Sequence, residues 1–435
     1  MREPLPTASQ APAPSCALPG SPLAQASAGI DACVHCGFCL QACPTYLALE
    51  DENDSPRGRI VLMRGLLDGD VALDDPVVQQ HMDRCLGCRA CETACPSGVP
   101  YGQLLEATRA TTRGSKAPPV IARLILWVFG SPRLLPLALF GDRLLRALGV
   151  PTLLAQLPGR AGAGMAMLAS TRPALGTTPY RATGDGAAGE VTLLRGCVME
   201  GLQSATNAAT ERTLIVNGYR VAETRAQGCC GALHAHAGDL DTARALAKAN
   251  IRAFEATPAA LIVVNAAGCG AMLKEYAHLL HHEPEWAARA AAVSARTRDV
   301  TELLAAVGPR PARLAAPVRI TYDAPCHLQH AQRITTPPMV VLQAIGNTTY
   351  VPLEDSDQCC GSAGTYETWS NISVSDAVLA PKLRNIAATE ATLVVTGNPG
   401  CLMQIGAGLL RSGSTTRVVH PVDLLDAAYA AESTP

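Results

Sequence analysis

Aromatic residues and net charge are both scarce in this sequence. Phe, Trp and Tyr make up 4% of its 435 residues, and 35 basic residues nearly balance 37 acidic ones. A nucleic-acid-binding surface needs a concentrated basic stripe, so this balance argues against that class of protein. No stretch contains the roughly 18 or more uncharged apolar residues of a membrane-spanning helix. The nearest, Pro118–Gly130, is short and contains Arg123, which favours a core helix over a membrane-surface helix.

Signatures of export and of several enzyme classes are also missing. The N-terminus has neither the apolar segment of a secretory signal nor a twin-arginine pair. We therefore expect a cytoplasmic protein, with peripheral attachment to the inner face of the cell membrane as an alternative. No Gly-rich phosphate loop follows an expected strand, which argues against NAD or FAD bound by this chain. The GxSxG and HExxH motifs do not occur either.

Cysteine, in contrast, is abundant. The chain has 17 cysteines, and most of them are tightly clustered. In a reducing cytosol such clusters bind metal or carry out redox chemistry, and disulfides are the less favoured interpretation. Cys16 stands alone in a stretch rich in Ala, Pro and Ser. We interpret residues 1–28 as a disordered tail and this cysteine as a bystander.

Eight cysteines near the N-terminus form two matching runs, each with the spacing Cys-x2-Cys-x2-Cys-x3-Cys-Pro. Bacterial two-cluster ferredoxins have this ligand spacing: three cysteines hold one [4Fe–4S] cluster, and the fourth holds the other cluster. We expect the fourth cysteine, which precedes proline, to start a helix that leads away from the other three cysteines of its run. Zinc prefers paired CxxC units or Cys/His mixtures and is the weaker alternative. By this rule residues 29–110 hold two clusters, one on Cys33, Cys36, Cys39 and Cys95 and the other on Cys85, Cys88, Cys91 and Cys43.

The 41 residues between Cys43 and Cys85 are expected to be helical. Within them, Ser55-Pro56-Arg57-Gly58-Arg59 places two guanidinium groups near clusters that carry negative charge. The two arginines either tune the clusters or dock a partner. Alternatively, the segment is an ordinary solvated turn and helix start, and the sequence leaves these interpretations open.

The rest of the chain predicts a helical connector over residues 111–189, broken by Pro and Gly, followed by an α/β region. From residue 190, short β-branched runs alternate with Ala/Leu-rich amphipathic stretches, which predicts a mainly parallel, layered sheet. Helices are expected near 202–216, 240–255, 374–389 and 402–411. The expected strands are Val191–Leu194, Leu261–Val264, Val318–Tyr322, Tyr350–Leu353 and Leu393–Thr396.

This α/β region contains an internal repeat of cysteines. In each copy a single Cys is followed after 32 or 33 residues by Cys-Cys-Gly, and then after 39 or 41 residues by a last Cys. The repeat predicts two similar lobes, residues 190–310 and 311–430, related by a pseudo-twofold axis. We favour a metal or redox site in each lobe over buried inert thiols, with zinc as the main competing metal. The candidate residues are Cys197, Cys229, Cys230 and Cys269 in one copy and Cys326, Cys359, Cys360 and Cys401 in the other.

Several histidines lie close to these cysteines in sequence. His327 and His330 follow Cys326, and His234 and His236 follow the first Cys-Cys-Gly. They are candidates for an occasional ligand or for hydrogen bonds to ligands, although surface and capping histidines are commoner. His281 and His282 are expected to be solvated.

The repeat resembles the cysteine-rich CCG domain family, found in heterodisulfide reductase subunits and respiratory dehydrogenase subunits. Some members hold a non-cubane [4Fe–4S] cluster with five cysteines in the pattern C…CCG…CxxC. In this chain Ala266 and Asn398 replace the first Cys of CxxC. Four cysteines remain in each copy, so a non-cubane cluster, a cubane cluster and a lost site all stay open.

Two ferredoxin motifs with two CCG repeats, over residues 29–430, resemble the iron–sulfur subunits of glycolate oxidases. The stretches Ser-Pro-Arg-Gly-Arg and Gly-Asn-Pro-Gly-Cys-Leu-Met-Gln are similar to stretches of that family. The resemblance implies a mainly helical ferredoxin-like module followed by two pseudo-symmetric α/β lobes. It also implies a relay of electrons from a partner FAD subunit that oxidises glycolate to glyoxylate, toward a quinone or another acceptor. The iron–sulfur subunit of anaerobic glycerol-3-phosphate dehydrogenase is the closest alternative, and a CCG half that itself reduces a disulfide or quinone is another.

Overall fold

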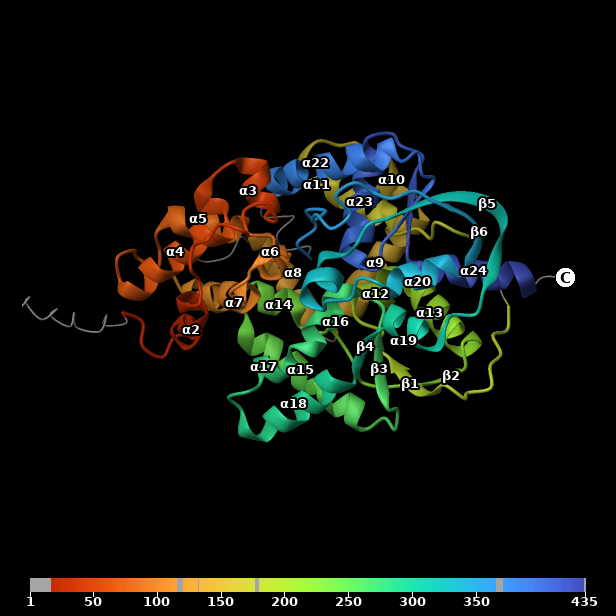
Figure 1. Ribbon diagram of the computed structural model, residues 1–435, viewed down its shortest axis with the longest axis horizontal. Helices are drawn as coiled ribbons and strands as arrows, with labels where there is room; N and C mark the ends of the chain where they lie inside the picture. The colour runs from red at the N-terminus through yellow and green to blue at the C-terminus, as the bar shows by residue number, and fades with distance from the viewer. Residues whose placement is uncertain (1–16, 116–119, 132, 177–179, 365–370, 434–435) are drawn as a thin grey trace, which may run out of the picture.

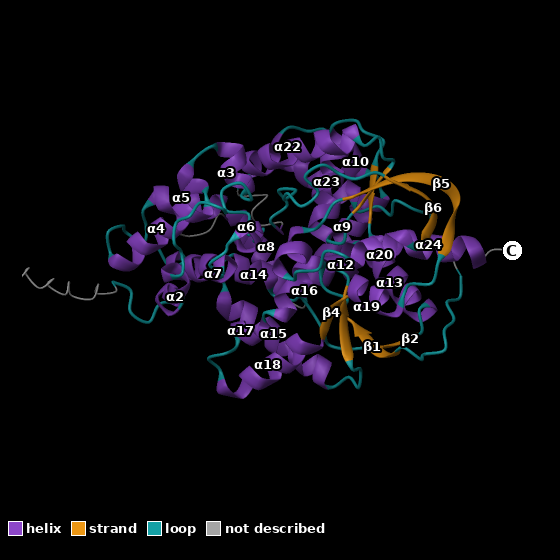
Figure 2. Cartoon of the chain, viewed as in Figure 1, coloured by secondary structure: helices purple, strands orange, loops and turns teal. Residues whose placement is uncertain are grey.

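The computed structural model describes residues 17–115, 120–131, 133–176, 180–364 and 371–433, so Cys16 lies outside the described residues. Figure 1 shows a helical N-terminal domain at one end of an elongated molecule, with two α/β lobes at the other end. The strands gather in two groups within these lobes, as Figure 2 shows. The predicted combination of a mainly helical module with α/β lobes is confirmed.

The N-terminal domain consists of short helices around the cysteine runs. Ser55 caps one of them, since its hydroxyl accepts a hydrogen bond from the Gly58 N–H at 2.9 Å, and Pro56 occupies the first helical position. The helices predicted between Cys43 and Cys85 are confirmed. The elements are α1 (Pro22–Gln25), α2 (Ser27–Asp31), α3 (Pro44–Leu49), η1 (Glu52–Asp54), α4 (Pro56–Asp68), α5 (Pro76–Arg84), α6 (Ala90–Ala94) and α7 (Tyr101–Thr112).

Two predictions for this domain are wrong. The disordered tail predicted for residues 1–28 does not extend over their last part, because α1 and α2 bury Leu23 and Ile30 in the core of the domain. The Leu23 N–H also donates to the Thr111 hydroxyl at 3.1 Å. In addition, only one of the two fourth cysteines starts a helix: Cys43 precedes α3, but Cys95 ends α6. A turn follows Cys95, with Gly98 in the left-handed region at φ +66°.

The connector is helical, as predicted. Its helices are α8 (Val120–Gly130), α9 (Leu134–Ala147), α10 (Val150–Leu154) and α11 (Gly159–Ser170). Within the described residues, no single helix has the length and apolar character needed to cross a membrane. Helices α8 and α9 reach the required length and apolar character only when they are counted together, and the chain bends by 109° at the break between them.

Lobe 1 runs from Gly189 to Val307 and contains a four-stranded parallel sheet in the order β2-β1-β3-β4. Its strands are β1 (Gly189–Leu193), β2 (Tyr219–Ala222), β3 (Leu261–Val264) and β4 (Thr297–Asp299). Its helices are α12 (Val198–Leu202), α13 (Ser204–Val216), α14 (Ala232–His236), α15 (Leu240–Glu255), α16 (Ala267–Lys274), α17 (Tyr276–Leu279), α18 (Pro284–Arg296) and α19 (Val300–Val307).

Lobe 2 runs from Ala312 to Ser433 and contains a second parallel sheet with the corresponding order, β6-β5-β7-β8. The strand predicted at Tyr350–Leu353 is wrong, since β6 ends at Tyr350; Pro352 has no N–H to donate to a neighbouring strand. The strands are β5 (Ala312–Tyr322), β6 (Ile345–Tyr350), β7 (Leu393–Val395) and β8 (Arg417–Val419). The helices are η2 (His327–Ala331), α20 (Pro337–Gln343), α22 (Ile372–Ala388), α23 (Pro399–Arg411) and α24 (Pro421–Ser433).

The two lobes share one apolar core. Val191 and Val263 of lobe 1 belong to the same buried cluster as Ile320 and Val395 of lobe 2. In each lobe the two central strands run parallel, and a cysteine follows the carboxyl end of each of them. The carboxyl ends of parallel strands meet at one edge of a sheet. This topology brings the cysteines of each repeat together, namely Cys197 and Cys269 after β1 and β3, and Cys326 and Cys401 after β5 and β7.

Candidate iron–sulfur sites and the cysteine pocket

Five cysteines of the N-terminal domain line a small cavity of about 30 Å³. Three come from the first run and two, Cys91 and Cys95, from the second. The four other than Cys91 are the set expected for one cubane cluster. Burial raises the pKa of the Cys39 thiol to about 11. This set lies near the surface, because Cys36 is exposed and the others are partly exposed. Its members are Cys33, Cys36, Cys39 and Cys95, and Arg57 and Tyr101 also line the cavity.

The second set, Cys43, Cys85, Cys88 and Cys91, is buried throughout. Burial raises the pKa of Cys91 well above its usual value, and the neighbouring Cys85 and Cys43 raise it further. Polar groups approach the sulfur atoms: the Tyr101 hydroxyl lies 3.8 Å from Cys85 Sγ. A buried set of soft thiols suits an iron–sulfur cluster better than a hydrated cation.

Arg59 is fully buried beside this second set. Its guanidinium pairs with the buried carboxylate of Asp54 at 3.1 Å and donates to the His81 carbonyl at 2.7 Å. Burial alone would lower the pKa of Arg59, but Cys85, Tyr101, Cys43 and Asp54 raise it above its ordinary value. The solvated-turn interpretation is therefore wrong for Arg59. Sequence reasoning missed Asp54, which also accepts from Arg84 at 2.8 Å.

Arg57 lies at the first set instead. Its Nη1 donates to the His35 carbonyl at 3.3 Å, and its Nε pairs with Glu52 at 2.8 Å. The guanidinium is about one third exposed. The two arginines of Ser-Pro-Arg-Gly-Arg thus lie at different thiol sets, one at the surface and one in the interior.

All eight cysteines of the repeat line one cavity of about 120 Å³, which we call the cysteine pocket. Sequence analysis expected a separate site in each lobe, but the lobes face each other so that both thiol sets share this space. Each Cys-Cys pair is followed by a glycine with positive φ, +89° at Gly231 and +81° at Gly361. A Cβ on Gly361 would lie 2.6 Å from the Ser375 carbonyl oxygen, so only glycine fits this turn.

The thiols of the pocket are close to one another and to the residues that replace the missing cysteines. Cys230 Sγ lies 3.2 Å from Cys269 Sγ. At the position of one missing cysteine, the Asn398 side chain donates to Cys401 Sγ at 3.5 Å and accepts from the Gly268 N–H at 3.2 Å. Asn398 therefore connects the lobes at the floor of the pocket.

The four candidate histidines have different surroundings. His236 and His327 line the pocket, and their ring centroids are 5.5 Å apart. His327 Nδ1 lies 3.6 Å from Cys326 Sγ, and burial lowers the pKa of His327 to about 3. His234 bonds through Nε2 to the Leu126 carbonyl, and His330 bonds to the Thr93 hydroxyl at 2.8 Å, so these two have structural partners instead.

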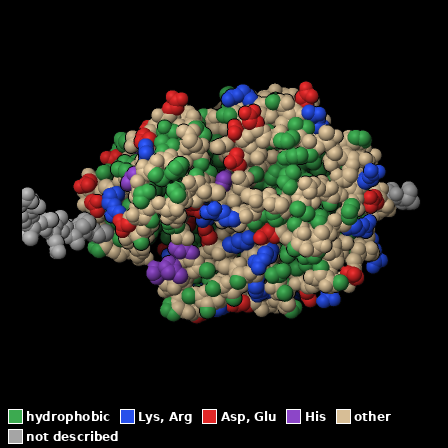
Figure 3. Space-filling model, in the orientation of Figure 1, with side chains coloured by type: hydrophobic (Ala, Val, Ile, Leu, Met, Phe, Trp, Pro, Cys, Tyr) green, Lys and Arg blue, Asp and Glu red, His purple; other side chains and the backbone are tan. Residues whose placement is uncertain are grey.

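His281 and His282 are exposed, as predicted. They lie with His278 at the rim of a third cavity of about 290 Å³, which Glu106 also lines. Figure 3 shows a patch of histidine side chains beside a hollow in this view. This cavity contains no cysteine.

The second thiol set adjoins the cysteine pocket. Leu86 lines the pocket, and it belongs to one buried cluster with Cys88, Cys326 and Cys359. Polar contacts also tie the N-terminal domain to the lobes, including the Arg89–Glu275 ion pair. No motif in the sequence indicated which lobe the second set would contact.

Lobe 2 has a buried ion pair that lobe 1 lacks at the corresponding positions. Lys382 Nζ lies 2.8 Å from Asp323 Oδ1, and both side chains are 2% exposed. Burial alone would lower the pKa of Lys382, but Asp323, Cys360 and Cys359 raise it. In lobe 1, Leu194 precedes Cys197 by the same three residues as Asp323 precedes Cys326. Sequence analysis missed this pair, although a lysine on the buried face of an amphipathic helix is a signal for one.

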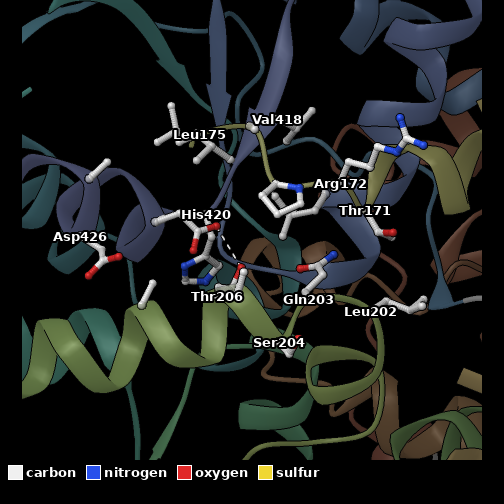
Figure 4. A pocket seen from close by; sticks show the side chains of 18 of the residues that line it. Thr171, Arg172, Leu175, Leu202, Gln203, Ser204, Thr206, Val418, His420 and Asp426 are labelled. Atoms are coloured by element: carbon white, nitrogen blue, oxygen red, sulfur yellow. Dashed lines mark hydrogen bonds between the residues drawn. The ribbon is translucent and has the colours of Figure 1, made fainter. Parts of the chain in front are cut away.

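A further cavity of about 90 Å³ lies between α13 and α24, and its lining contains no cysteine. Figure 4 shows Gln203 and Thr206 facing His420 across it. The Thr206 hydroxyl donates to the Asp423 carboxyl at 2.9 Å. Burial raises the pKa of Asp423 to about 7.

The fold and its thiol sets define an iron–sulfur electron-transfer protein, in which a helical two-cluster domain is joined to two cysteine-rich α/β domains. Sequence models of two families match the chain. The 4Fe-4S dicluster domain matches residues 29–99, and the cysteine-rich domain called CCG matches residues 191–274 and 320–406. The two families thus cover both groups of cysteines.

Two bacterial proteins are similar to almost the whole chain. The probable glycolate oxidase iron-sulfur subunit of Bacillus subtilis (strain 168) is 37% identical over 421 residues, covering 90% of this chain and 92% of that protein. The glycolate oxidase iron-sulfur subunit of Escherichia coli (strain K12) is 36% identical over 415 residues, covering 94% and 96%. The chain belongs to the family of glycolate oxidase iron–sulfur subunits, which confirms the resemblance found in the sequence.

A shorter relative covers part of the chain. Lactate utilization protein A of Geobacillus kaustophilus (strain HTA426) is 30% identical over 239 residues, which are 55% of this chain and 99% of that protein.

Proposed function

We propose that this chain is the electron-transfer subunit of a complex that oxidises glycolate to glyoxylate. The carrying observation is the combination of thiols at the first cavity, where cysteines of both runs meet: Cys33, Cys36 and Cys39 of the first run, and Cys91 and Cys95 of the second. The family relation supports glycolate as the substrate of the complex. Within it, a partner FAD subunit would take two electrons from the 2-hydroxy acid.

The residues that would hold the cofactors are the two N-terminal thiol sets. Cys33, Cys36, Cys39 and Cys95 would hold one [4Fe–4S] cluster, and Cys43, Cys85, Cys88 and Cys91 the other. When bound, such clusters accept and return electrons one at a time. Arg59, buried beside Cys43 and Cys85, places a positive charge at the second set and would favour its reduced, more negative state.

The exposed first set is the proposed entry point for electrons. Val34 and Phe38 lie within the same loop and are 68% and 66% exposed, so an apolar surface surrounds Cys36. Such a surface suits a flavoprotein partner, since interface centres are enriched in aromatic and apolar side chains. From this loop, the thiol sets follow one another inward to Cys88 and then to the cysteine pocket.

The cysteine pocket is the proposed end of this order. We infer that the lobes are related by a pseudo-twofold axis, since both sheets have the same order and both CCG turns have a glycine with positive φ. Each set of four thiols would hold a further cluster, with zinc as the competing metal. The final acceptor would be a quinone or another oxidant, and we place the complex at the inner face of the cell membrane as a peripheral assembly.

The test is anaerobic co-purification of the chain with its partner, followed by substrate-dependent dye reduction. The proposal predicts that the complex reduces the dye with glycolate and that the isolated chain does not. Dye reduction with glycerol 3-phosphate instead would assign the complex to that substrate and refute the glycolate proposal. A Phe38→Ser variant should lower the rate at unchanged iron content. Val77→Ser, which changes an apolar residue of comparable exposure on α5, is the matched control and should leave the rate unchanged.

A second candidate function is favoured by the arrangement of the cysteine pocket. Eight thiols from two lobes line one cavity, so the CCG half could itself reduce a quinone or a disulfide there. Variants Cys230→Ser and Cys360→Ser test whether the pocket takes part in electron transfer to the acceptor. A relay confined to the N-terminal domain keeps dye reduction and acceptor reduction alike. Loss of acceptor reduction alone refutes that confined relay and places the last step at the pocket.

A further inference from the structure

The connector helices expose an apolar face that no described part of the chain covers. On α8, Val120, Leu124 and Trp127 are 54–80% exposed and follow the spacing i, i+4, i+7. The opposite side of α8 is anchored, since Ala122 and Leu126 are buried. An isolated exposed apolar residue needs no explanation, but a continuous stripe on one helix face does.

The neighbouring helix α9 repeats this arrangement. Leu137, Phe140, Leu144 and Leu148 are 51–69% exposed and follow the spacing i, i+3, i+7, i+11 at the end of the helix. Leu153 of α10 extends the stripe, with 80% of its surface exposed. We call these exposed residues of α8, α9 and α10 the connector face.

The charge around the connector face has one sign. Between residues 120 and 172 the chain has six arginines and a single acidic residue, Asp142, although the whole chain has a formal charge of −2. Arg123 and Arg133 are exposed at its edge. Arg143 and Arg146 donate to main-chain carbonyl groups, including Gly201 and Leu202, and these contacts leave their positive charge uncompensated.

We propose that the connector face binds the surface of an anionic lipid bilayer. Helices that lie in a membrane interface combine Leu, Trp and Phe on one side with arginines at the rim, which meet anionic headgroups. The 109° bend between α8 and α9 suits two helices that lie on a surface, and neither helix alone is long enough to cross a bilayer. This inference deepens the proposed peripheral association and rests on it.

The face is attached to the cysteine pocket through its buried side. His234, which closely follows the first Cys-Cys-Gly, bonds to the Leu126 carbonyl of α8 at 3.0 Å. Leu139 of α9 packs against Gly201 in α12, the helix that begins directly after Cys197. A bilayer bound at the connector face would therefore hold the pocket close to the membrane surface, where a lipid-soluble oxidant is concentrated.

The test is flotation of the full complex with vesicles of phosphatidylcholine alone or mixed with anionic phosphatidylglycerol. We expect the complex to float with the anionic vesicles. The variant Trp127→Ser/Phe140→Ser/Leu144→Ser should bind the anionic vesicles at least about tenfold more weakly than the wild type. The variant Arg123→Gln/Arg133→Gln should show a loss of the same size. Val61→Ser/Val77→Ser, which changes two residues of comparable exposure on α4 and α5, is the matched control and should bind like the wild type.

The proposal fails if the wild-type complex does not float, or if the triple variant floats equally well. It also fails if the triple variant instead loses its flavoprotein or changes its oligomeric state, because a protein then covers this face. Glycolate-dependent reduction of a water-soluble dye distinguishes the two proposals. Intact dye reduction without flotation refutes the membrane contact alone, and absent dye reduction in the wild type refutes the proposed function.

Discussion

Cys88 of the N-terminal domain and Cys326 of lobe 2 lie in one buried cluster of side chains, together with Leu86 and Cys359. They are close enough for charge on Cys88 to raise the pKa of Cys326. The chain thus joins its two groups of cysteines through lobe 2, without an intervening polar layer at this contact. Such a contact gives a short path between redox sites that are far apart in the sequence.

Substitution at this contact should separate the two groups of cysteines. Cys88→Ser removes a ligand of the second N-terminal set, and we expect the iron content to fall by about four atoms per chain. Cys326→Ser, on the other side of the contact, should leave the roughly eight irons of the N-terminal domain in place. Iron and sulfide analysis of anaerobically purified variants checks this. Fewer than about eight irons per chain in the Cys326→Ser variant would contradict the assignment of ligands.

The buried pair of Lys382 and Asp323 should be costly to break on one side. Lys382→Met leaves the Asp323 carboxylate buried without its cation, and we expect a loss of about 3–5 kcal/mol in the free energy of unfolding. The double variant Lys382→Met/Asp323→Leu, which reproduces Leu194 of lobe 1, should recover most of this loss. Denaturant unfolding measures both. If the double variant were no more stable than the single one, the two side chains would do more than neutralise each other's charge.

The glycines of the two CCG turns should differ in their tolerance of a side chain. Both have positive φ, which costs a non-glycine residue about 1–2 kcal/mol. A Cβ at Gly361 would lie 2.6 Å from a backbone oxygen, but one at Gly231 would lie 3.2 Å from its nearest backbone oxygen. Gly361→Ala should therefore destabilise the protein more than Gly231→Ala in thermal unfolding. Gly413→Ala, with φ +74° and open space around it, gives the cost of φ alone; equal losses at all three positions would rule out the clash.

Asp423 should make stability depend on pH. Its pKa of about 7 in the folded protein exceeds the value of about 3.9 in an unfolded chain. Between these values the native state keeps a proton that the unfolded state releases, so the free energy of unfolding falls as pH rises from 4 to 7. Asp423→Asn removes this loss. The free energy of unfolding of the variant minus that of the wild type should therefore be about 2–4 kcal/mol larger at pH 8 than at pH 5.

Melting temperatures of wild type and Asp423→Asn across this pH range provide the measurement. Glu285→Gln, a substitution on the exposed side of α18, is the control and should show no such difference. A constant difference between Asp423→Asn and wild type at all pH values would contradict a buried, protonated carboxyl.

The local chemistry of this protein could be predicted from its sequence, because ligand spacing and strand patterns are local properties. The runs around Cys33 and Cys85, the central strands β1, β3, β5 and β7 and the helices α13, α15, α22 and α23 followed directly from such patterns, but the outer strands did not. Helix starts were less certain: the turn after Cys95 depends on Gly98, whose positive φ the spacing of cysteines does not reveal.

Properties that depend on how the domains pack were not predictable in this way. The cysteine repeat predicted a separate thiol set in each lobe, but only the shared core of the lobes brings both sets to one pocket. The sequence left open whether Arg59 tunes a cluster, docks a partner or belongs to a solvated turn, since its partner Asp54 lies on a separate short helix. The tail residue Leu23 is buried because α7 offers it both an apolar surface and the Thr111 hydroxyl.

The most direct test of this account is the iron, sulfide and paramagnetic content of the chain purified without oxygen. We predict at least about eight irons and eight sulfides per chain, with a paramagnetic signal that appears on reduction. Colourless protein that contains no sulfide and gives no signal on reduction would contradict the assignment of Cys33 through Cys95 as cluster ligands.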